Sequence, residues 1–207
     1  MNPIHHIWFD FSDTIVAFDE ELHDELVYES YSEITGKPIT SELKEEFTAL
    51  FKEHGSFTKS FVALGKPHDF WSGRISSVDP KVFLRLTDPD APHIFQELRK
   101  LVPISLWSNI HAKKMLPSLG IDPAWFTHIL GPDEVKKPKP ALDGFHLLIE
   151  RSGIPSEEIL FVGDSLVKEI RPAMTLGIQT GLIWSESPEA DYCFENFKEI
   201  LTLVQPS

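Results

Sequence analysis

Short apolar runs alternate with longer amphipathic stretches along most of this chain. The first run, residues 4–9, is rich in aromatic and β-branched residues and ends at Asp10. A run of this length and composition is typical of a strand that is buried on both faces of a sheet. Similar runs predict further strands at residues 102–107, 126–130, 159–162 and 178–184.

Amphipathic stretches with apolar residues at helical spacing separate these strands. In the second half of the chain they predict helices at residues 90–101, 112–119, 142–151, 167–176 and 194–204. Strands that alternate with helices specify a parallel sheet with right-handed crossovers. We therefore predict an α/β fold with a doubly wound parallel sheet.

The stretch between the first strand and the alternating region has a different character. Residues 17–87 contain helical patterns at 19–35, from Thr40 or Ser41 to Gly55, at 57–64 and near 80–86. A segment of this length is too long for a loop of a compact domain. We predict an α/β core formed by residues 1–16 and 88–207, with residues 17–87 inserted as a small helical cap.

Composition narrows the class of protein and its partners. The chain of 207 residues carries 19 basic and 32 acidic side chains, a formal net charge of −13, and 42% hydrophobic residues. This acidic balance argues against nucleic acid and anionic membranes as partners, because both need clustered Lys and Arg. The single cysteine, Cys193, and the absence of an apolar run of ~18 residues predict a cytoplasmic protein without a membrane span.

Four polar positions fall at strand ends or in loops of the predicted sheet. In open parallel sheets the chemistry lies beyond the carboxyl ends of the strands, so these positions should converge there. Each alone is compatible with a turn, a helix cap or a solvated charge. The four positions are Asp10, Ser108 with Asn109, Lys139, and Asp164 with Glu169.

Together these residues match the needs of phosphoryl transfer, which requires a nucleophile, a divalent metal and donors around the phosphoryl oxygens. Asp10 can attack phosphorus, and Asp10, Asp164 and a backbone carbonyl near Ser12 can hold Mg²⁺. Ser108 and the amides that follow it can bind a phosphoryl oxygen, while Lys139 offers a compact positive charge.

At this point the sequence resembles the haloacid dehalogenase superfamily of hydrolases over residues 4–15 and 88–204. The resemblance implies a Rossmann-like core, a helical cap inserted after the first motif, and Lys139 in preference to Lys137 as the site lysine. It also places Thr14, Ser108, Asn109 and Lys139 beside the substrate, and adds Ser12 and Glu169 to the metal site. The motifs are Asp10-Phe-Ser-Asp-Thr14, Leu106-Trp-Ser-Asn109, Lys139-Pro140 with Asp143 and Phe145, and Gly163-Asp164 with Glu169 five residues on.

The sequence departs from the family pattern two residues after the nucleophile. The resembling phosphatases carry there an Asp that protonates the leaving group and then activates water. In this chain the position is Ser12, and Asp13 takes the place of the usual Gly. A serine hydroxyl is no acid near neutral pH, so we expect a slow site, another acid such as His23, or different chemistry.

These observations predict a Mg²⁺-dependent phosphatase that forms an aspartyl-phosphate on Asp10 and acts on a small phosphorylated metabolite. Asp10, Ser12, Ser108 and Lys139 are the predicted catalytic residues, and His23 is a candidate substrate contact. Two alternatives stay open: a catalytically impaired binding protein, which Ser12 favours, and a dehalogenase or phosphonate-cleaving hydrolase that uses the same Asp10. The sequence leaves open whether the protein is a monomer or a homodimer.

Overall fold

The chain divides into two compact units whose boundaries lie in two short strands. A computed structural model describes residues 2–135 and 137–204. One unit comprises the described residues up to 17 and from 85 onward, and the other comprises residues 18–84. The boundaries fall within β2 (Val16–Phe18) and β3 (Leu84–Leu86), which form a two-stranded sheet.

The first unit is built on a parallel sheet. Its strand order, among the described residues, is β5-β4-β1-β6-β7-β8, and every neighbouring pair is parallel. The predicted doubly wound parallel sheet is therefore confirmed, and the carboxyl ends of all its strands lie at one edge. The strands are β1 (His6–Phe9), β4 (Ile104–Trp107), β5 (Ile129–Leu130), β6 (Ile159–Gly163), β7 (Gln179–Ile183) and β8 (Tyr192–Phe194).

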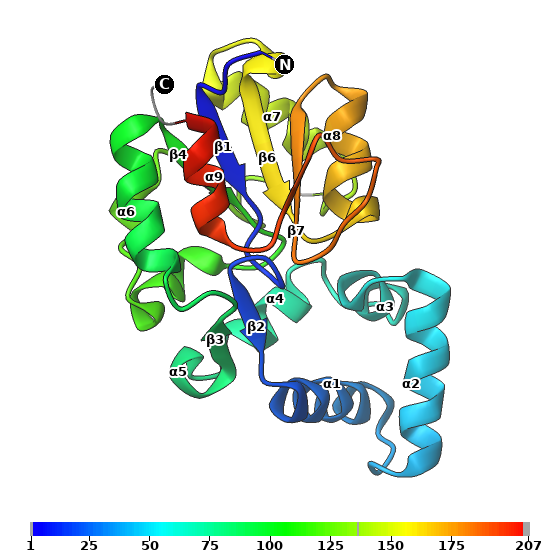
Figure 1. Ribbon diagram of the computed structural model, residues 1–207. Helices are drawn as coiled ribbons and strands as arrows, with labels where there is room; N and C mark the ends of the chain where they lie inside the picture. The colour runs from blue at the N-terminus through cyan, green and yellow to red at the C-terminus, as the bar shows by residue number, and fades with distance from the viewer. Residues whose placement is uncertain (1, 136, 205–207) are drawn as a thin grey trace. The chain divides into compact units, whose positions relative to one another are not determined.

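Helices cover both faces of this sheet (Figure 1). On one face α6 (Ala91–Leu101) packs against α9 (Phe197–Val204), and on the other α7 (Leu142–Ser152) packs against α8 (Arg171–Thr175). The buried strands β1, β4 and β6 lie between these two layers. Their apolar sequences follow from burial on both faces.

Several parts of this unit differ from the sequence prediction. The helix predicted at 112–119 is two short 3₁₀ turns, Ala112–Lys114 and Leu116–Leu119, where Pro117 cannot donate a helical hydrogen bond. The helix predicted at 167–176 begins as a π-helical turn, Leu166–Ile170, and continues as α8. Strand β8 was not predicted, and further 3₁₀ turns lie at Pro123–Trp125 and Ser156–Glu158.

The second unit is helical, as its sequence pattern predicts. Thr40 caps α2 by accepting a hydrogen bond from the Leu43 amide, and Gly55 ends that helix in the left-handed conformation. Helix α4 was not predicted, and β3 takes the place of the end of the helix predicted near 80–86. The helices are α1 (Glu20–Thr35), α2 (Ser41–His54), α3 (Phe57–Ala63), α4 (Phe70–Ser76) and α5 (Pro80–Phe83).

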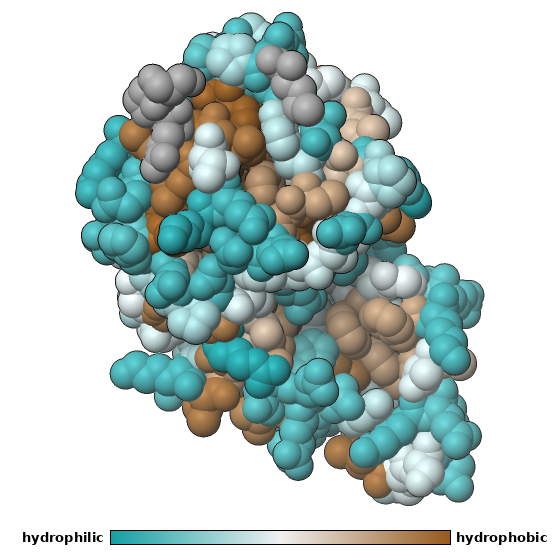
Figure 2. Space-filling model, in the orientation of Figure 1, coloured by the Kyte–Doolittle hydropathy of each residue, from teal (hydrophilic) through white to brown (hydrophobic). Residues whose placement is uncertain are grey.

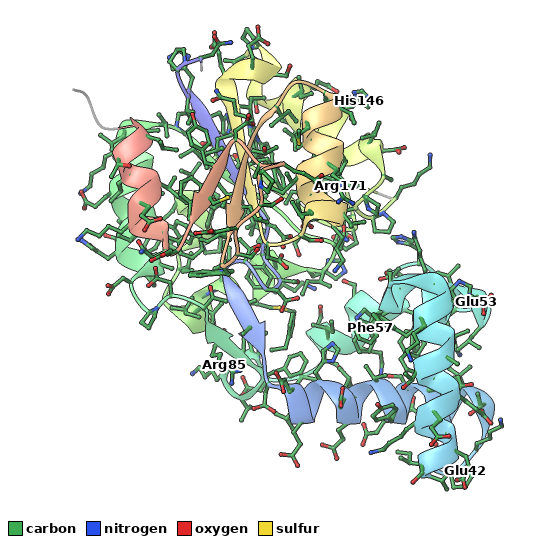
Figure 3. All side chains as sticks on the ribbon, turned by 45° about the vertical axis from the view of Figure 1, so that its right-hand side comes forward. Glu42, Glu53, Phe57, Arg85, His146 and Arg171 are labelled. Atoms are coloured by element: carbon green, nitrogen blue, oxygen red, sulfur yellow. The ribbon has the colours of Figure 1, made fainter. Side chains whose placement is uncertain are left out.

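Aromatic side chains fill the interior of the helical unit. Phe57 points into this interior (Figure 3), and its ring lies 4.6 Å from that of Phe51 and 5.3 Å from that of Trp71. Phe61 is fully buried and stacks on Trp71 at 5.3 Å. The unit therefore has its own apolar core, as expected of an inserted domain.

Hydrophilic residues cover much of the face shown in Figure 2, with apolar residues in smaller patches between them. This distribution agrees with the formal net charge of −13. Within residues 2–135 and 137–204, none of the helices combines the length and apolar character needed to cross a bilayer.

Candidate active site

Three neighbouring strands bring the predicted site residues to one edge of the sheet. Asp10 follows β1, Ser108 follows β4, and Asp164 follows β6. Because β4, β1 and β6 are adjacent and parallel, their carboxyl ends meet. The backbone amide of Asp10 donates to the Val162 carbonyl at 2.9 Å, which extends the hydrogen-bonded pairing of β1 with β6 as far as Asp10.

Asp10 is nearly buried, and its two carboxylate oxygens have different partners. The side-chain ammonium of Lys139 donates to Oδ1, and the Thr14 hydroxyl lies 3.3 Å from Oδ2. Both Asp10 and Lys139 are no more than 4% exposed. The structure thus places Lys139 on Asp10, whereas Lys137 pairs with exposed Asp143 at 3.2 Å on the surface.

Lys139 also contacts a second carboxylate and two aromatic rings. Its Nζ lies 3.1 Å from Oε1 of buried Glu169, and 5.3 Å and 5.6 Å from the ring centroids of Trp107 and Phe161. These contacts favour a cation, because carboxylates and aromatic faces both attract positive charge. The four neighbours fix the ammonium at one point of the site.

Thr14 links the two carboxylates that end β1 and β6. Its hydroxyl lies 3.3 Å from Asp10 Oδ2 and 3.2 Å from Asp164 Oδ1, and Thr14 is fully buried. A hydroxyl has one proton, so the two acceptors share it. The sequence places Thr14 at the substrate, and the structure shows that it holds Asp10 and Asp164 together.

The site contains more buried negative charge than Lys139 can balance. Burial, followed by the charges of Asp10 and Asp13, raises the pKa of Asp164 to about 6. Burial likewise raises the pKa of Glu169 to about 8, although Lys139 opposes this change. Burial alone lowers the pKa of Lys139, but Asp10 and Glu169 outweigh it and hold that pKa above its usual range.

This arrangement fits a hard divalent cation such as Mg²⁺. Mg²⁺ binds through one or two carboxylates and keeps several waters, and Asp10 and Asp164, both within 3.3 Å of the Thr14 hydroxyl, meet that need. Among the described residues no three His, Cys, Asp or Glu side chains form a metal-binding group. Glu169, also predicted as a ligand, has both oxygens engaged, since Oε2 accepts from the Ser165 amide at 3.0 Å and Oε1 faces Lys139.

Ser108 and Asn109 each accept a hydrogen bond from a backbone amide, but from different parts of the chain. Ser108 is buried, and its hydroxyl oxygen accepts from the Ile110 amide at 3.2 Å. Among residues 2–135 and 137–204 its proton has no acceptor, so it can face a ligand. Asn109 Oδ1 accepts from the backbone amide of Lys139 at 2.9 Å. Asn109 thereby fixes the main chain of the loop that carries the lysine.

The loop after Asp10 turns sharply at the position where the sequence departs from the family pattern. Asp13 has φ 62°, a left-handed conformation that Gly adopts freely and Asp tolerates. The Asp13 amide donates to the Val16 carbonyl at 2.7 Å, which closes the turn. Ser12 is half-buried in this turn, and Asp13 is exposed.

His23 lies in the helical unit and packs among aromatic rings. Its ring lies 4.9 Å from that of Phe57, 5.4 Å from that of Trp71 and 5.6 Å from that of Phe18. Burial lowers the pKa of His23, so this imidazole is neutral at physiological pH. Its predicted role as acid or substrate contact stays a prediction, and its visible role is in the core of its own unit.

Some residues of the site were not predicted from the sequence. Trp107 and Phe161 flank Lys139, and Thr87 and Trp184 both donate to the carbonyl of Thr14. The sequence could have indicated Trp184, because this residue directly follows β7 at the same edge of the sheet as Asp10. No local pattern marks the other three, whose roles come from packing.

Comparisons with known sequences agree with this geometry. A model of the haloacid dehalogenase-like hydrolases matches residues 4–173. The sequence is 27% identical over 174 residues to glyceraldehyde 3-phosphate phosphatase of Methanocaldococcus jannaschii, which covers 79% of this chain and 76% of that protein. It is 32% identical over 122 residues to phosphoglycolate phosphatase of Escherichia coli K12, over 56% of this chain but only 44% of that enzyme.

Solved structures share the fold at lower sequence identity. A HAD phosphatase from Thermococcus onnurineus superposes with a TM-score of 0.76 at 22% identity, over 97% of both chains. The HAD-hydrolase YfnB from Bacillus subtilis gives a TM-score of 0.66 at 17% identity, over 99% of this chain and 100% of that one. At these identities the likeness establishes the fold.

Proposed function

The chain belongs to the haloacid dehalogenase-like hydrolase family, and we propose that it is a Mg²⁺-dependent phosphohydrolase acting on a small phosphorylated metabolite. The observation that carries this proposal is the Thr14 hydroxyl, 3.3 Å from Asp10 and 3.2 Å from Asp164, with Lys139 on the other oxygen of Asp10. A nucleophile, a cation and a place for a divalent metal thereby meet at one edge of the sheet.

In the proposed first step, a carboxylate oxygen of Asp10 attacks phosphorus. The bond from phosphorus to the substrate oxygen breaks, and an aspartyl-phosphate forms on Asp10. Lys139 and the Ser108 hydroxyl face the negative charge that spreads over the phosphoryl oxygens. Asp10, Asp164 and the Ser12 carbonyl would hold Mg²⁺, which would supply further positive charge for those oxygens.

In the second step, water attacks the phosphorus of the aspartyl-phosphate, which releases phosphate and restores the Asp10 carboxylate. Both steps need a proton transfer, first to the leaving alcohol oxygen and then from the attacking water. Ser12 occupies the position from which a carboxyl group would serve both transfers, and its hydroxyl cannot do so near neutral pH. We therefore propose that turnover is slow, with solvent water carrying the protons.

The proposed substrate class rests on the names of the relatives. The two curated relatives are phosphatases, one named for glyceraldehyde 3-phosphate and the other for phosphoglycolate. Both names describe small organic phosphates. We propose a substrate of this class, a phosphate ester with a short carbon skeleton.

A second candidate function rests on Ser12. Without a positioned acid, the same pocket of donors could bind a phosphorylated ligand and turn it over at a negligible rate. A dehalogenase or phosphonate-cleaving reaction at Asp10 is the remaining alternative, and dehalogenation needs no metal. The half-buried carboxylate of Asp164, which the Thr14 hydroxyl links to Asp10, favours the metal-dependent reaction over dehalogenation.

The test is a phosphatase assay of wild-type protein and Asp10→Asn, with Mg²⁺ and with excess chelator. The substrates are p-nitrophenyl phosphate, 2-phosphoglycolate and glyceraldehyde 3-phosphate, with 2-chloropropionate and phosphonoacetaldehyde as probes of the alternatives. We expect activity that requires Mg²⁺ and falls by ~10³-fold or more in Asp10→Asn, since loss of a covalent nucleophile costs several orders of magnitude. Asp143→Asn, an exposed carboxylate paired with Lys137, is the matched control and should keep full activity.

Different results separate the candidates. Chelator-resistant release of halide would replace the phosphatase by a dehalogenase. Saturable binding of phosphate esters without release of phosphate would support the binding protein. An Asp10→Asn variant as active as Asp143→Asn would exclude Asp10 as the nucleophile.

A further inference from the structure

Trp184 has an unusual backbone conformation just beyond the end of β7. Its φ is 70°, in the left-handed region that favours glycine. For a bulky aromatic residue this conformation is rare, and it persists only where the surrounding structure imposes it. A conformation held against its intrinsic preference suggests that the side chain is needed where it lies.

Two neighbours hold the main chain and ring of Trp184 in place. Its amide donates to the Phe194 carbonyl at 3.0 Å, which extends the pairing of β7 with β8. Its ring makes a T-shaped contact with the Phe197 ring, on α9, at a centroid distance of 5.5 Å. Strand β8 and helix α9 therefore fix the direction of the indole.

The indole is directed at the loop that follows Asp10. Its Nε1 donates to the Thr14 carbonyl at 3.0 Å, and the Thr87 hydroxyl donates to the same carbonyl at 2.7 Å. The Thr87 amide donates to the next carbonyl along, that of Ile15, at 3.1 Å. The main chain at Thr14 is thus held from two separate parts of the fold.

We infer that Trp184 is a positioning residue, whose indole N–H holds the Thr14 carbonyl so that the Thr14 hydroxyl stays between Asp10 and Asp164. The inference rests on the proposed function, because only that function gives the position of the Thr14 hydroxyl a catalytic consequence. Carbonyl and hydroxyl belong to one residue, so rotation of the backbone there moves the hydroxyl away from the two carboxylates. A displacement of this kind matters, since small errors in the position of reacting groups slow catalysis strongly.

The test is Trp184→Phe, which keeps an aromatic ring against Phe197 and removes the N–H. We expect the Mg²⁺ concentration that gives half of the metal-induced rise in Tm, measured without substrate, to increase about threefold to tenfold. The value of kcat should fall over a similar range, while KM stays within about twofold. The matched control is Tyr192→Phe, which removes a hydrogen bond of 3.2 Å to Gln179 at the opposite end of β7.

A second variant tests the same contact independently, in case Trp184→Phe fails to fold. Thr87→Val removes the other donor to the Thr14 carbonyl without touching an aromatic ring, and it should shift the Mg²⁺ response and kcat in the same direction. If Trp184→Phe and Thr87→Val respond to Mg²⁺ as Tyr192→Phe does, in an active wild-type background, the inference is wrong. A wild-type protein without metal-dependent phosphatase activity would instead overturn the proposed function itself.

Discussion

Lys139 shows how one side chain can organise a buried charged site. Its ammonium is enclosed by Asp10, Glu169 and the rings of Trp107 and Phe161. Burial alone would favour the neutral amine, yet the two carboxylates hold the pKa above its usual range. The lysine is therefore a permanent cation, suited to neutralising charge and unsuited to donating the proton that Ser12 does not supply.

Replacement of Ser12 by Asp tests whether a missing acid limits this enzyme. We expect Ser12→Asp to raise kcat by at least tenfold, because a carboxyl group at this position can protonate the leaving oxygen and then activate water. Such a gain needs only ~1.4 kcal/mol of barrier reduction, well within the range of general acid–base catalysis. The measurement is steady-state turnover together with the burst of product in the first cycle, which should be present in wild type and smaller in the variant.

The control for the added charge is Ser41→Asp, at an exposed position in the first turn of α2. It should leave turnover unchanged. A wild-type protein that shows no burst, together with a slower Ser12→Asp variant, would mean that proton transfer is not the step that limits turnover. The neighbouring charges of Asp10 and Asp13 could produce that result by raising the pKa of the new carboxyl group.

At the scale of elements, the lysine site depends on the close approach of α7 to β4. Gly144 lies in the first turn of α7, and a Cβ built on it would come within 2.1 Å of the Trp107 ring. The same ring lies 5.3 Å from the Lys139 ammonium. Helix α7 can therefore approach the sheet this closely only with glycine at this position. The contact between Gly144 and the Trp107 ring holds that ring beside Lys139.

Gly144→Ala should lower the free energy of unfolding by roughly 1–3 kcal/mol, the usual cost of overpacking a close contact. Gly73→Ala is the matched control, because Gly73 is an exposed helical glycine with no atom within 4 Å of an added Cβ. That variant should gain about 0.5–1 kcal/mol from the better helix propensity of alanine. Chemical denaturation of both variants measures the difference, and equal stabilities would show that the Trp107 contact yields without cost.

Elements that are specified locally were predictable from the sequence. Helix α2 begins after Thr40, one of its two predicted caps, and is closed by Gly55, because both signals lie in the chain itself. Strands β2, β3 and β8 have only three residues each, so they carry too little pattern and owe their existence to pairing. The π-helical turn before α8 contains Glu169, whose side chain accepts from the Ser165 amide, and no local pattern predicts it.

The site residues likewise fall into those that the sequence could predict and those that it could not. The rule that chemistry gathers at the carboxyl ends of parallel strands located Asp10, Ser108 and Asp164. The choice of Lys139 over Lys137 needed the resemblance to a family, because both lysines precede or follow prolines in one loop. The hold of Trp184 on Thr14 joins residues 170 positions apart, and only the folded chain brings them together.

At the scale of the whole molecule, the candidate active site and a histidine that affects stability in acid lie at opposite ends of the sheet. Asp10 follows the carboxyl end of β1, whereas His6 begins the same strand at its amino end. His6 is buried, bonded through Nε2 to the Ser105 hydroxyl at 2.8 Å and stacked on Trp8 at 5.6 Å. Burial, and then the nearby His128, lowers the pKa of His6 from 6.5 to about 4.

This buried histidine contributes a loss of stability in mild acid. Above pH 6.5 the imidazole is neutral in the folded and the unfolded chain, so its contribution is constant. Between pH 6.5 and about 4 the unfolded chain binds a proton that the folded chain does not, and stability falls as the pH falls. The difference in pKa corresponds to roughly 3 kcal/mol as an upper bound. Below about pH 4 both states are protonated at His6 and the loss stops.

Relative to wild type, His6→Gln should therefore gain stability as the pH falls from 6.5 to 4, because glutamine stays neutral and can still bond Ser105. The comparison with wild type isolates His6, since the raised pKa values of Asp164 and Glu169 make stability rise with acid in both proteins. His146→Gln, at an exposed position of α7 labelled in Figure 3, is the control and should follow wild type. The measurement is the free energy of unfolding from urea titrations across this range. Parallel curves for wild type and His6→Gln would show that His6 is protonated in the folded protein or that the fold opens to accommodate its charge.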